Sequence, residues 1–598
     1  MRRRRAIAVA AFAAVAALAT VPLGLYAHYR LTGLTAHRYL GLLIEEIRRR
    51  DPPGAELAVT LLHATLLDPG RVQDPVDRYP PDLEAPLPIW RGSGASALQR
   101  DIAPRYGGDG APIALADVNR WLLAAPPQPR ARLRVTSAAA LLRAAGNARA
   151  GTVISLAPGR YRIDTPIALR GDGRADAPIV LRAPRLGRAI LEFGTAGALR
   201  VEGDYWFLGN LVLRGACAGA CAPPLRVAAG ARAVTLRNLF ASGVRAVATG
   251  STVDRGLAEG ITVLDGAALD RAGGWRQVSL RRVRSRRVET GALVACATPG
   301  AAHDCDGTDL QRLLERAGDN ALLLLRAGVY RQGARIRRPL RLLAEPGAVL
   351  AGGAIAGKGA LLVDADLTVE GLECRGVRVS DGNGACLRQQ RGDVTLRNVF
   401  FHDAQMGVLT GHRGGALRIV DSLVRDSGSG GDGQLGHNVY VNSGTLAFIR
   451  SWSLAARNGG HGIKSRAART LIRDSLVASL NARDSRLVDL PEAGLLHIAG
   501  TVLGEGPRSE NQDVIGYGLE LGEDGPAHPD NRIIIEGNTI YLDRPQGARL
   551  LHQRHAGRVT LGGNVVVGRW RRVDGNAAFA DRRAAGVAPY PALTRLAH

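Results

Sequence analysis

The stretch LIRDSLV, residues 471–477, contains the unit from which most of this chain is built. A short apolar run leads into a polar turn residue, Asp474, and a second apolar run follows it. From residue 398 onward, most repeats of the unit are separated by between the low twenties and about thirty residues. The unit recurs as TLRNLF, TLRNVFF, RIVDSLV, FIRSWSL, HIAGTVL, IEGNTIY and LGGNVVV, which places Asn238, Asn398, Asp421, Ser451, Gly500, Asn538 and Asn564 in the turn column.

Short alternating strands with turn residues at this period are typical of a parallel β-helix, in which each repeat forms one rung. Asn and Asp suit stacked turns, because their side chains bond to turn backbone and tolerate left-handed conformations. A β-propeller would need blades of about 40 residues with four strands each, and the chain lacks that period. The chain has 75 Gly but only 8 Phe, a composition that suits strands stacked between tight turns. The sequence therefore predicts an all-β, right-handed parallel β-helix over residues 131–575.

Two stretches repeat one plan and divide the solenoid. TSAAALLRAAGNARAGTVISLAPGRYRI (residues 136–163) and DGTDLQRLLERAGDNALLLLRAGVYRQG (residues 306–333) each read as a short amphipathic helix followed by a strand. A helix over the open end of a solenoid protects its first rung. We therefore expect two β-helix modules, residues 131–299 and 300–575, with a tail over 576–598; one continuous solenoid with a decorated loop is the alternative.

The N-terminus predicts export. A basic start, RRRR, precedes an apolar run from Ala6 to about Tyr26, near the roughly 20 residues that span a bilayer. Residues 1–34 are expected to be an uncleaved signal anchor in a bacterial-type inner membrane, with the body in the periplasm. Cleavage near Ala17-Leu18-Ala19 would give a secreted protein instead. Residues 35–130 read as a helical and Pro-rich stalk without recognisable chemistry.

Charge and cysteine content fit this compartment. The formal net charge of +24 favours an anionic partner, although arginines scattered along the chain are also explained by compositional bias. Export makes nucleic acid an unexpected partner and leaves acidic polysaccharide as the expected one. The six cysteines fall into local pairs, for which three disulfides are a better interpretation than a zinc site, since no pair has CxxC spacing. The expected bridges are Cys217–Cys221, Cys296–Cys305 and Cys374–Cys386.

One group of rungs carries most of the ionisable side chains. In HNVYV, the apolar pair Val439 and Val441 predicts that Asn438 and Tyr440 point to solvent. In HGIKSR, the same alternation buries Ile463 and turns the next polar positions outward. The outward residues of HGIKSR are Lys464 and Arg466.

Later rungs extend the patch. RLVDLP turns Asp489 outward, and in IGYGLELG the pattern turns Glu520 outward and leaves Tyr517 undecided. Since stacked rungs lie about 4.8 Å apart, Tyr440, Lys464 and Asp489 are expected to form a column. We expect Tyr440, His461, Lys464 and Arg466 to be catalytic, and His437, Asn438, Asp489, Tyr517 and Glu520 to bind substrate.

Each of these residues also has a structural interpretation. Lys464 and Arg466 could be an exposed solvated pair, and His437 and His461 could form a stacked turn ladder, since two histidines alone make a poor metal site. Asp489 could cap a turn, and Tyr440 could pair across rungs. The coincidence of so many ionisable groups in one column favours a functional site.

Residues 154–215, which include ISLAPGRYR and LRVEGDYWFLGNLVLRG, resemble the opening of pectate-lyase-like β-helix proteins, most of all the polysaccharide lyases that include alginate lyases and chondroitinase B. That resemblance implies removal of the proton alpha to a uronate carboxylate by a lysine base, with arginine nearby. The family's lysine lies in an Ile-Ser-x-Lys-Ser strand, which GIKSRA (residues 462–467) resembles. The resemblance implies that Lys464 is the base and that Arg466 is the partner of the substrate carboxylate or of the acid.

The chain departs from this family at the metal site. The acidic calcium ligands that precede the family's lysine are missing, and NGGHG (residues 458–462) stands in their place. No metal ligands are therefore assigned: calcium stays possible, but its acidic ligands are not matched, and His461, Arg466 or another cation would have to neutralise the substrate carboxylate. We expect Arg466 and the histidines, if charged, to lower the pKa of Lys464 towards a useful range.

The sequence leaves several functions open. β-Elimination of an acidic, uronate-containing polysaccharide is the first prediction. A glycoside hydrolase or a uronate C5-epimerase on the same fold is the second, and a non-catalytic polysaccharide-binding or envelope-assembly protein is the third. Two carboxylates about 5–10 Å apart beside Lys464 would favour the hydrolase.

Overall fold

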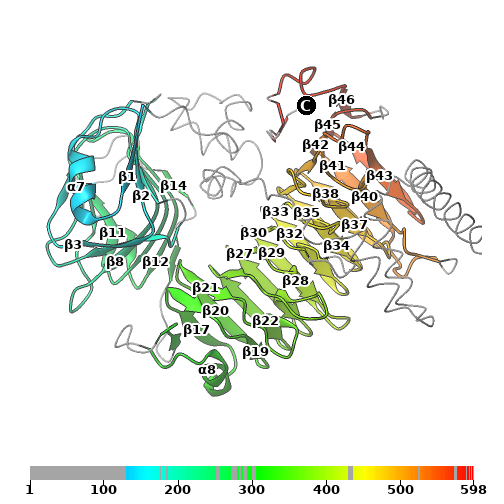
Figure 1. The fold of residues 1–598 in the computed structure, drawn as a ribbon, viewed down its shortest axis with the longest axis horizontal. Helices are drawn as coiled ribbons and strands as arrows, with labels where there is room; N and C mark the ends of the chain where they lie inside the picture. The colour runs from blue at the N-terminus through cyan, green and yellow to red at the C-terminus, as the bar shows by residue number, and fades with distance from the viewer. Residues whose placement is uncertain are drawn as a thin grey trace, which may run out of the picture.

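The computed structural model describes residues 130–598, apart from short internal and C-terminal segments (Figure 1). The signal anchor predicted over residues 1–34 and almost all of the stalk predicted over 35–130 lie outside the described residues. Among the residues that are described, no helix is long and apolar enough to cross a membrane. The segments left out are residues 175–176, 184–185, 251–255, 271–278, 282–283, 287–291, 299–304, 429–435, 523–524, 571–574, 588, 591–592, 594 and 597–598.

The N-terminal part of the described chain forms two parallel sheets. The smaller sheet has five strands, β4 (Ile167–Leu169), β7 (Leu199–Val201), β9 (Leu225–Val227), β11 (Ala246–Gly250) and β13 (Ala267–Leu269). The larger sheet has ten strands, β1 (Ala131–Val135), β2 (Thr152–Leu156), β3 (Gly159–Ile163), β5 (Ile179–Arg182), β6 (Ala189–Phe193), β8 (Trp206–Gly215), β10 (Thr235–Ser242), β12 (Leu257–Leu264), β14 (Ser279–Arg281) and β15 (Arg284–Arg286).

The rest of the described chain is a longer solenoid with three parallel sheets. Its first sheet contains β16 (Leu293–Ala295), β17 (Ala321–Leu325), β20 (Leu340–Ala344), β23 (Leu367–Glu370), β26 (Val394–Arg397), β29 (Ala416–Val420), β32 (Thr445–Ile449), β35 (Arg469–Arg473), β38 (Leu495–Ala499), β41 (Arg532–Glu536) and β44 (Arg558–Gly562). Its second sheet contains β18 (Gly328–Tyr330), β21 (Ala348–Ala351), β24 (Glu373–Arg375), β27 (Phe400–His402), β30 (Leu423–Arg425), β33 (Trp452–Leu454), β36 (Leu476–Ala478), β39 (Val502–Glu505), β42 (Thr539–Leu542), β45 (Val565–Val567) and β46 (Ala577–Phe579).

The third sheet of this solenoid, called the nine-stranded sheet below, carries the predicted site. Between its two end strands, each strand pairs in parallel with the strand one rung before and one rung after it. Its strands are β19 (Ala334–Ile336), β22 (Gly359–Val363), β25 (Ala385–Gln389), β28 (Met406–Thr410), β31 (Val439–Val441), β34 (Ile463–Ser465), β37 (Val488–Leu490), β40 (Asp513–Tyr517) and β43 (Arg549–Gln553). The predicted parallel β-helix is confirmed.

The interior of the longer solenoid is filled by one inward residue after another from all three sheets. Val439, Ile463 and Val488 occupy equivalent places on successive rungs, and each is fully buried. Their outward neighbours are free to carry polar groups, as the alternation along each strand predicted. At the C-terminal end, β46 pairs with β45, so the solenoid runs past residue 575 into the predicted tail.

The turn column behaves largely as predicted. Asn238, Asn398, Asp421, Asp474 and Gly500 have positive φ angles of 50° to 61°, the left-handed conformation that Asn, Asp and Gly tolerate. In the other three repeats the residue with positive φ is one place earlier. There Arg450, Gly537 and Gly563 take the strained position, while Ser451, Asn538 and Asn564 are buried and bonded to neighbouring turns.

Both predicted helical caps are present. The helix α7 (Ala138–Gly146) begins at Ser137, whose hydroxyl accepts a hydrogen bond from Ala140 N at 3.1 Å. The helix α8 (Leu310–Arg316) begins at Asp309, whose carboxylate accepts from two backbone N–H groups in its first turn. Both helices direct leucine side chains into the core, so they seal the rungs that they cover.

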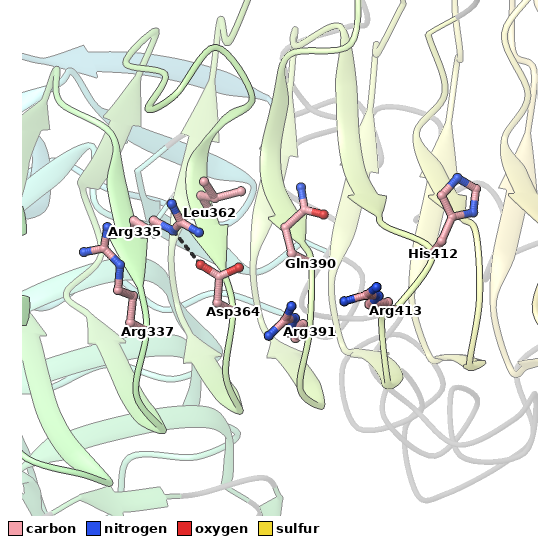
Figure 2. Close-up of a pocket in the computed structure, with 8 residues that line it drawn as sticks. All are labelled: Arg335, Arg337, Leu362, Asp364, Gln390, Arg391, His412 and Arg413. Carbon is pink, nitrogen blue, oxygen red and sulfur yellow. Dashed lines mark hydrogen bonds and ion pairs between the residues drawn. The ribbon is translucent and has the colours of Figure 1, made fainter.

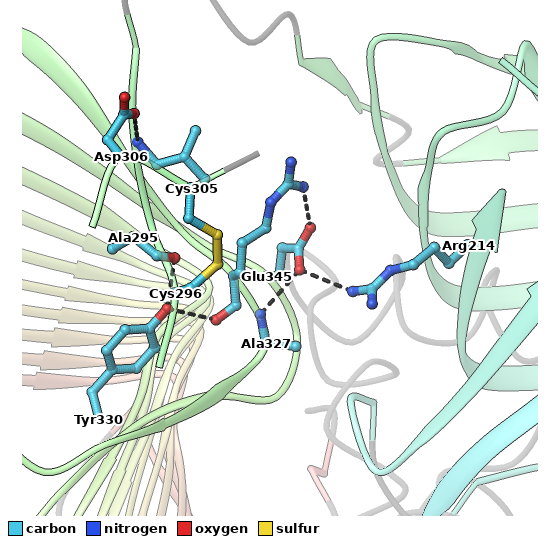
Figure 3. Close-up of a disulfide and its surroundings, with 10 residues drawn as sticks. Arg214, Ala295, Cys296, Cys305, Asp306, Ala327, Tyr330 and Glu345 are labelled. Atoms are coloured by element: carbon cyan, nitrogen blue, oxygen red, sulfur yellow. Dashed lines mark hydrogen bonds and ion pairs between the residues drawn. A yellow bond between two sulfur atoms is a disulfide. The ribbon is translucent and has the colours of Figure 1, made fainter. Parts of the chain in front are cut away.

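The two parts meet at a buried carboxylate (Figure 3). Glu345, 1% exposed, accepts hydrogen bonds from Arg214 of β8 at 3.0 Å, from Arg326 at 2.8 Å and from Ala327 N at 3.0 Å. An apolar cluster that includes residues of β8 and β10 as well as β17 and β20 also joins the two parts, and Ala327 packs against it. Figure 1 shows the N-terminal part, in cyan, beside the first rungs of the longer solenoid, in green. Whether residues 131–299 and 300–575 fold as independent modules stays a prediction.

All three predicted disulfides are confirmed. The bridges join Cys217 to Cys221, Cys296 to Cys305 (Figure 3) and Cys374 to Cys386. No cysteine remains free. Disulfides persist in oxidising compartments, so these bridges are typical of an extracytoplasmic protein.

A buried acidic cluster lies beneath the turns that follow β36 and β39. Asp484, Glu505 and Glu510 are each 1% exposed. Burial raises the pKa of Asp484 from its ordinary 3.8 to about 8, and the charge of Glu510 acts in the same direction. Burial also raises the pKa of Glu505. In the folded protein Asp484 and Glu505 therefore keep their protons at pH values where the unfolded chain has lost them.

This difference predicts that the free energy of unfolding falls as the pH rises from about 4 to about 8. In that window the unfolded chain binds fewer protons than the folded one, at a cost of about 1.4 kcal/mol per pH unit for each such group. In Asp484→Asn, the free energy of unfolding should therefore fall less steeply with rising pH, by about 1.4 kcal/mol per pH unit. Urea unfolding at pH 5 and pH 8 measures it, and an unchanged decline in the variant would contradict the assignment.

Candidate active site

The nine-stranded sheet places the predicted column in register. Tyr440 of β31 lies beside Lys464 of β34, which lies beside Asp489 of β37. The row runs in both directions along the sheet and contains Arg335, Leu362, Arg388 and Leu409 before Tyr440, and Gly516 and His552 after Asp489. Tyr440, Lys464 and Asp489 are therefore neighbours on one face of the solenoid.

Lys464 lies between two carboxylates. Its Nζ donates to Glu520 Oε1 at 2.8 Å and lies 4.0 Å from Asp489 Oδ2. The same ammonium group lies 5.6 Å from the centre of the Tyr440 ring. The lysine side chain is only 10% exposed, so its charged end faces this polar site rather than bulk solvent. The prediction that cations are the nearest charged neighbours of Lys464 is wrong. These neighbours are acidic, because the turn after β40 brings Glu520 across the sheet.

Arg466 is fixed by three hydrogen bonds. Its Nε donates to the Tyr440 hydroxyl at 3.0 Å, and its terminal nitrogens donate to Glu492 and Glu520. Burial would lower the pKa of Arg466, but the bonds and charge interactions with Tyr440 and Glu520 outweigh burial and raise it. The guanidinium therefore stays charged, and its fork holds one carboxylate oxygen of Glu520 while Lys464 holds the other.

Glu520 is the most exposed member of the site. Its side chain is 46% exposed and lies on the turn that follows β40. Burial would raise the pKa of Glu520, but the charges of Lys464 and Arg466 and their hydrogen bonds lower it below the ordinary glutamate value. A carboxylate is thus held between an ammonium and a guanidinium at the surface of the sheet.

Asp489 is 1% exposed, and Arg486 binds its carboxylate. Arg486 donates to its Oδ1 at 3.2 Å and reaches Asp513 Oδ2 at 3.3 Å with its other terminal nitrogen. Gly516 is required here, because a Cβ at that position would lie 2.5 Å from Asp489 Oδ1 and 2.6 Å from the Arg486 side chain. Asp489 therefore supports the site without facing a bound chain.

The two histidines form the stacked ladder that was the alternative interpretation. Their rings lie 5.0 Å apart at an angle of 4°. His437 Nδ1 accepts from His461 N at 2.9 Å, and His461 Nδ1 accepts from Arg486 N at 3.0 Å. Both are buried, His461 to 1% exposure, so neither is placed to contact a sugar, and His461 Nε2 faces Asp489 Oδ2 at 3.6 Å. The predicted roles of His437 in substrate binding and of His461 in catalysis have no support from their positions.

Two further predicted residues also lie inside. Asn438 precedes β31 on a turn, where strand alternation does not apply. It is fully buried and its Nδ2 donates to Ser453 Oγ and Leu454 O. Tyr517 ends β40 on the inward face, where its hydroxyl donates to Gly494 O at 2.7 Å and burial raises its pKa. The prediction that Asn438 points to solvent is wrong, and the predicted contacts of Asn438 and Tyr517 with substrate have no support from these positions.

Sequence reasoning missed Glu492 and Arg486. Glu492 follows Pro491 just beyond β37 and accepts from Arg466 at 2.6 Å. Arg486 precedes β37 and joins Asp489 to Asp513. Both lie outside the strands, so no alternation pattern points to them. The only sequence signal is their nearness to Asp489.

The residues around Lys464 do not fit a calcium ion. Calcium takes six to eight oxygen ligands, whereas residues 458–462 provide no carboxylate and the nearby Asp489 and Glu520 are paired with cationic side chains. Across the described residues, no group of three or more His, Cys, Asp or Glu side chains is arranged to hold a metal ion.

Comparison with known proteins gives structural likeness alone. No protein-family model matches the chain. No curated protein matches it either.

Among solved structures, an alginate lyase from Paenibacillus is 13% identical and matches 73% of this chain and 99% of its own, with a TM-score of 0.20. The family 6 alginate lyase AlyGC is 11% identical over 73% of this chain and 100% of its own, with a TM-score of 0.25. An α-1,3-glucanase catalytic domain bound to nigerose is 11% identical over 58% of this chain and 66% of its own, with a TM-score of 0.21. At these identities and TM-scores the matches indicate neither substrate nor mechanism.

Proposed function

We propose that this protein is an exported enzyme that cleaves a uronate-containing polysaccharide by β-elimination on its nine-stranded sheet. The supporting observation is the carboxylate of Glu520, held between Lys464 and Arg466 on an outward face. A pair of cationic groups that binds a protein carboxylate has the charge and hydrogen-bond donors to bind a uronate carboxylate. In this proposal the substrate carboxylate takes the place of Glu520, which swings outward on its turn.

Three side chains then have distinct roles. Arg466 binds the substrate carboxylate and stabilises the negative charge that develops on it. Lys464 first releases its ammonium proton to solvent; as the free amine it then accepts the proton alpha to that carboxylate, and the C–H electron pair forms the new double bond. The bond to the leaving oxygen breaks, and Tyr440 protonates that oxygen. Because the Tyr440 oxygen accepts from Arg466 Nε, its own hydrogen is available and the resulting phenolate is stabilised.

A glycoside hydrolase is the second candidate, because two carboxylates lie beside Lys464. Lys464 Nζ lies 2.8 Å from Glu520 Oε1 and 4.0 Å from Asp489 Oδ2. These two oxygens are therefore at most about 7 Å apart, a separation within the range that glycosidases use. A glycosidase also needs a protonated acid with a raised pKa. Interactions with Lys464 and Arg466 lower the pKa of Glu520, so it is not the protonated acid that a glycosidase needs. Asp489 is too deeply buried to contact a glycosidic oxygen. Both observations favour elimination over hydrolysis.

A C5-epimerase would use the same first step and return the proton to the opposite face. A non-catalytic binding protein would use Lys464 and Arg466 for affinity alone. Export is supported by the three disulfides. Anchoring through residues 1–34 in an inner membrane, with the body in the periplasm, remains part of the proposal, as does secretion after cleavage.

The experiment incubates the purified chain with a panel of acidic polysaccharides and follows the ultraviolet absorbance of unsaturated uronate. Elimination predicts that absorbance rises with at least one uronate polymer and stays flat with a neutral glucan. Cleavage of a polymer without absorbance would support the hydrolase. Binding to acidic polymers without cleavage would support the non-catalytic protein.

Glu520→Gln separates the two enzyme proposals. The amide keeps the shape of Glu520 but lacks the charge that competes for Lys464 and Arg466. If Glu520 occupies the place of the substrate carboxylate, KM should fall about threefold to tenfold, since exposed charge pairs contribute about 1 kcal/mol, with kcat within about threefold of the parent. If Glu520 were a catalytic acid or base, kcat would fall by about 10²-fold or more. Steady-state kinetics on the best substrate of the panel measures both constants.

A further inference from the structure

A basic cavity of about 690 Å³ lies on the same sheet, several rungs before Lys464 (Figure 2). Two of its lining residues, Arg335 and Leu362, belong to the outward row that continues to Lys464. The others follow the ends of neighbouring strands. The cavity is lined by Arg335, Arg337, Leu362, Asp364, Gln390, Arg391, His412 and Arg413.

The charge of this cavity is largely uncompensated. Its one acidic residue, Asp364, is paired with Arg335 at 2.5 Å. Arg337, Arg391 and Arg413 are exposed, and none of them forms an ion pair with another residue that the structure describes. We call these three residues the arginine trio. Like charges gathered in one cavity repel one another, so the trio provides a site for an anion with several negative groups.

The cavity and the candidate site lie on one continuous surface. Three strand steps, from β25 through β28 and β31 to β34, separate Arg391 from Arg466, which is about 14 Å at the usual strand spacing. Counted from the paired row of Arg388, Leu409, Tyr440 and Lys464, the positions equivalent to Arg466 on the preceding rungs are Asn442, Gly411 and Gln390, which are uncharged, and Arg391 follows Gln390 directly. A polymer that extends from Lys464 to the arginine trio therefore crosses uncharged positions on the rungs between them.

We propose that the arginine trio is a remote subsite that binds a carboxylate- or sulfate-bearing sugar of the same polysaccharide whose reacting unit lies at Lys464. This inference rests on the proposed function and adds a minimum chain length to it. A nucleic acid is disfavoured because no Phe, Tyr or Trp lines the cavity, which leaves His412 as its one ring on which a base could stack. The ligand is thus an anionic sugar chain long enough to bridge both sites.

The test measures binding of uronate oligosaccharides of increasing length to the full-length Lys464→Ala protein by calorimetry at constant salt. Kd should fall at least tenfold once the chain is long enough to reach Arg391. In Arg337→Gln/Arg391→Gln/Arg413→Gln added to this background, that gain should disappear, with long oligosaccharides bound about 10- to 100-fold more weakly and disaccharides bound within twofold of before.

The matched control is Arg397→Gln/Arg473→Gln/Arg558→Gln in the same background. These arginines are also exposed, but they lie on β26, β35 and β44 of the first sheet, so the change in charge is identical and the face is different. Equal weakening by both triple variants would reduce the effect to overall charge and overturn the subsite.

Other results overturn the proposal in distinguishable ways. A Kd that does not depend on length, with cleavage by the parent intact, removes the subsite but keeps the proposed function. No binding of any length together with no cleavage by the parent removes both. Inorganic sulfate binding as tightly as the long oligosaccharide would make the cavity a free-anion site. Tighter binding of single-stranded DNA of equal charge would make it a nucleic-acid site.

Discussion

Replacing Lys464 with alanine is expected to lower kcat by about 10²- to 10⁴-fold on a uronate polymer that the parent protein cleaves, the usual contribution of a positioned proton acceptor. Substrate binding should weaken much less, because Arg466 retains its fork for the carboxylate. The cavity left behind is small, and the lysine lies on the outward row rather than in the core. Kinetics and direct binding measurements on the two proteins separate these effects.

Lys464→Arg sharpens this experiment. Arginine keeps the positive charge but does not deprotonate in proteins. If Lys464 accepts the proton, Lys464→Arg should be as inactive as Lys464→Ala. If Lys464 only neutralises charge, Lys464→Arg should keep much of the parent activity. Full activity in Lys464→Ala would show that the reaction occurs elsewhere.

The second large effect is expected for Arg466. Removing its guanidinium takes away its hydrogen bond to the carboxylate and the donor that supports Tyr440. Charge-assisted hydrogen bonds contribute about 1.5–3 kcal/mol each. Arg466→Ala should therefore lower kcat/KM by about 10²- to 10³-fold, with most of the loss in KM and a further loss in kcat because Tyr440 becomes a poorer acid.

Arg466→Lys and Tyr440→Phe divide the two parts of that effect. Lysine keeps the charge but not the planar fork, so Arg466→Lys should recover only part of the binding. Tyr440→Phe keeps Arg466 and loses the proton donor, so kcat should fall while KM stays near the parent value. A normal kcat in Tyr440→Phe would remove Tyr440 from the mechanism.

Much of the fold could be predicted because it depends on local rules. Alternation decides which residues point inward, and turns that repeat Asn, Asp or Gly fix where each rung bends. Where a turn used the pair Gly537-Asn538, the alignment placed the bend one residue late, since either residue can accept a positive φ. The caps were predictable because Ser137 and Asp309 are ordinary helix starts before apolar faces.

The site was predictable only where it lies on strands. The row of Tyr440, Lys464 and Asp489 follows from alternation and from one rung per repeat. Asn438 sits on a turn, where the same rule does not apply, and it proved to be buried. The contact of Glu520 with Lys464 joins residues 56 apart through a turn, and no local pattern encodes such a distance.

The most direct test of β-elimination is the mass of the products formed in water labelled with heavy oxygen. Elimination adds no solvent oxygen, so each cleavage should give one unsaturated product without the label, and Lys464→Ala should give almost none. Hydrolysis would place one labelled oxygen in a saturated product at every cleavage. Labelled, saturated products from the parent protein would contradict the proposed mechanism.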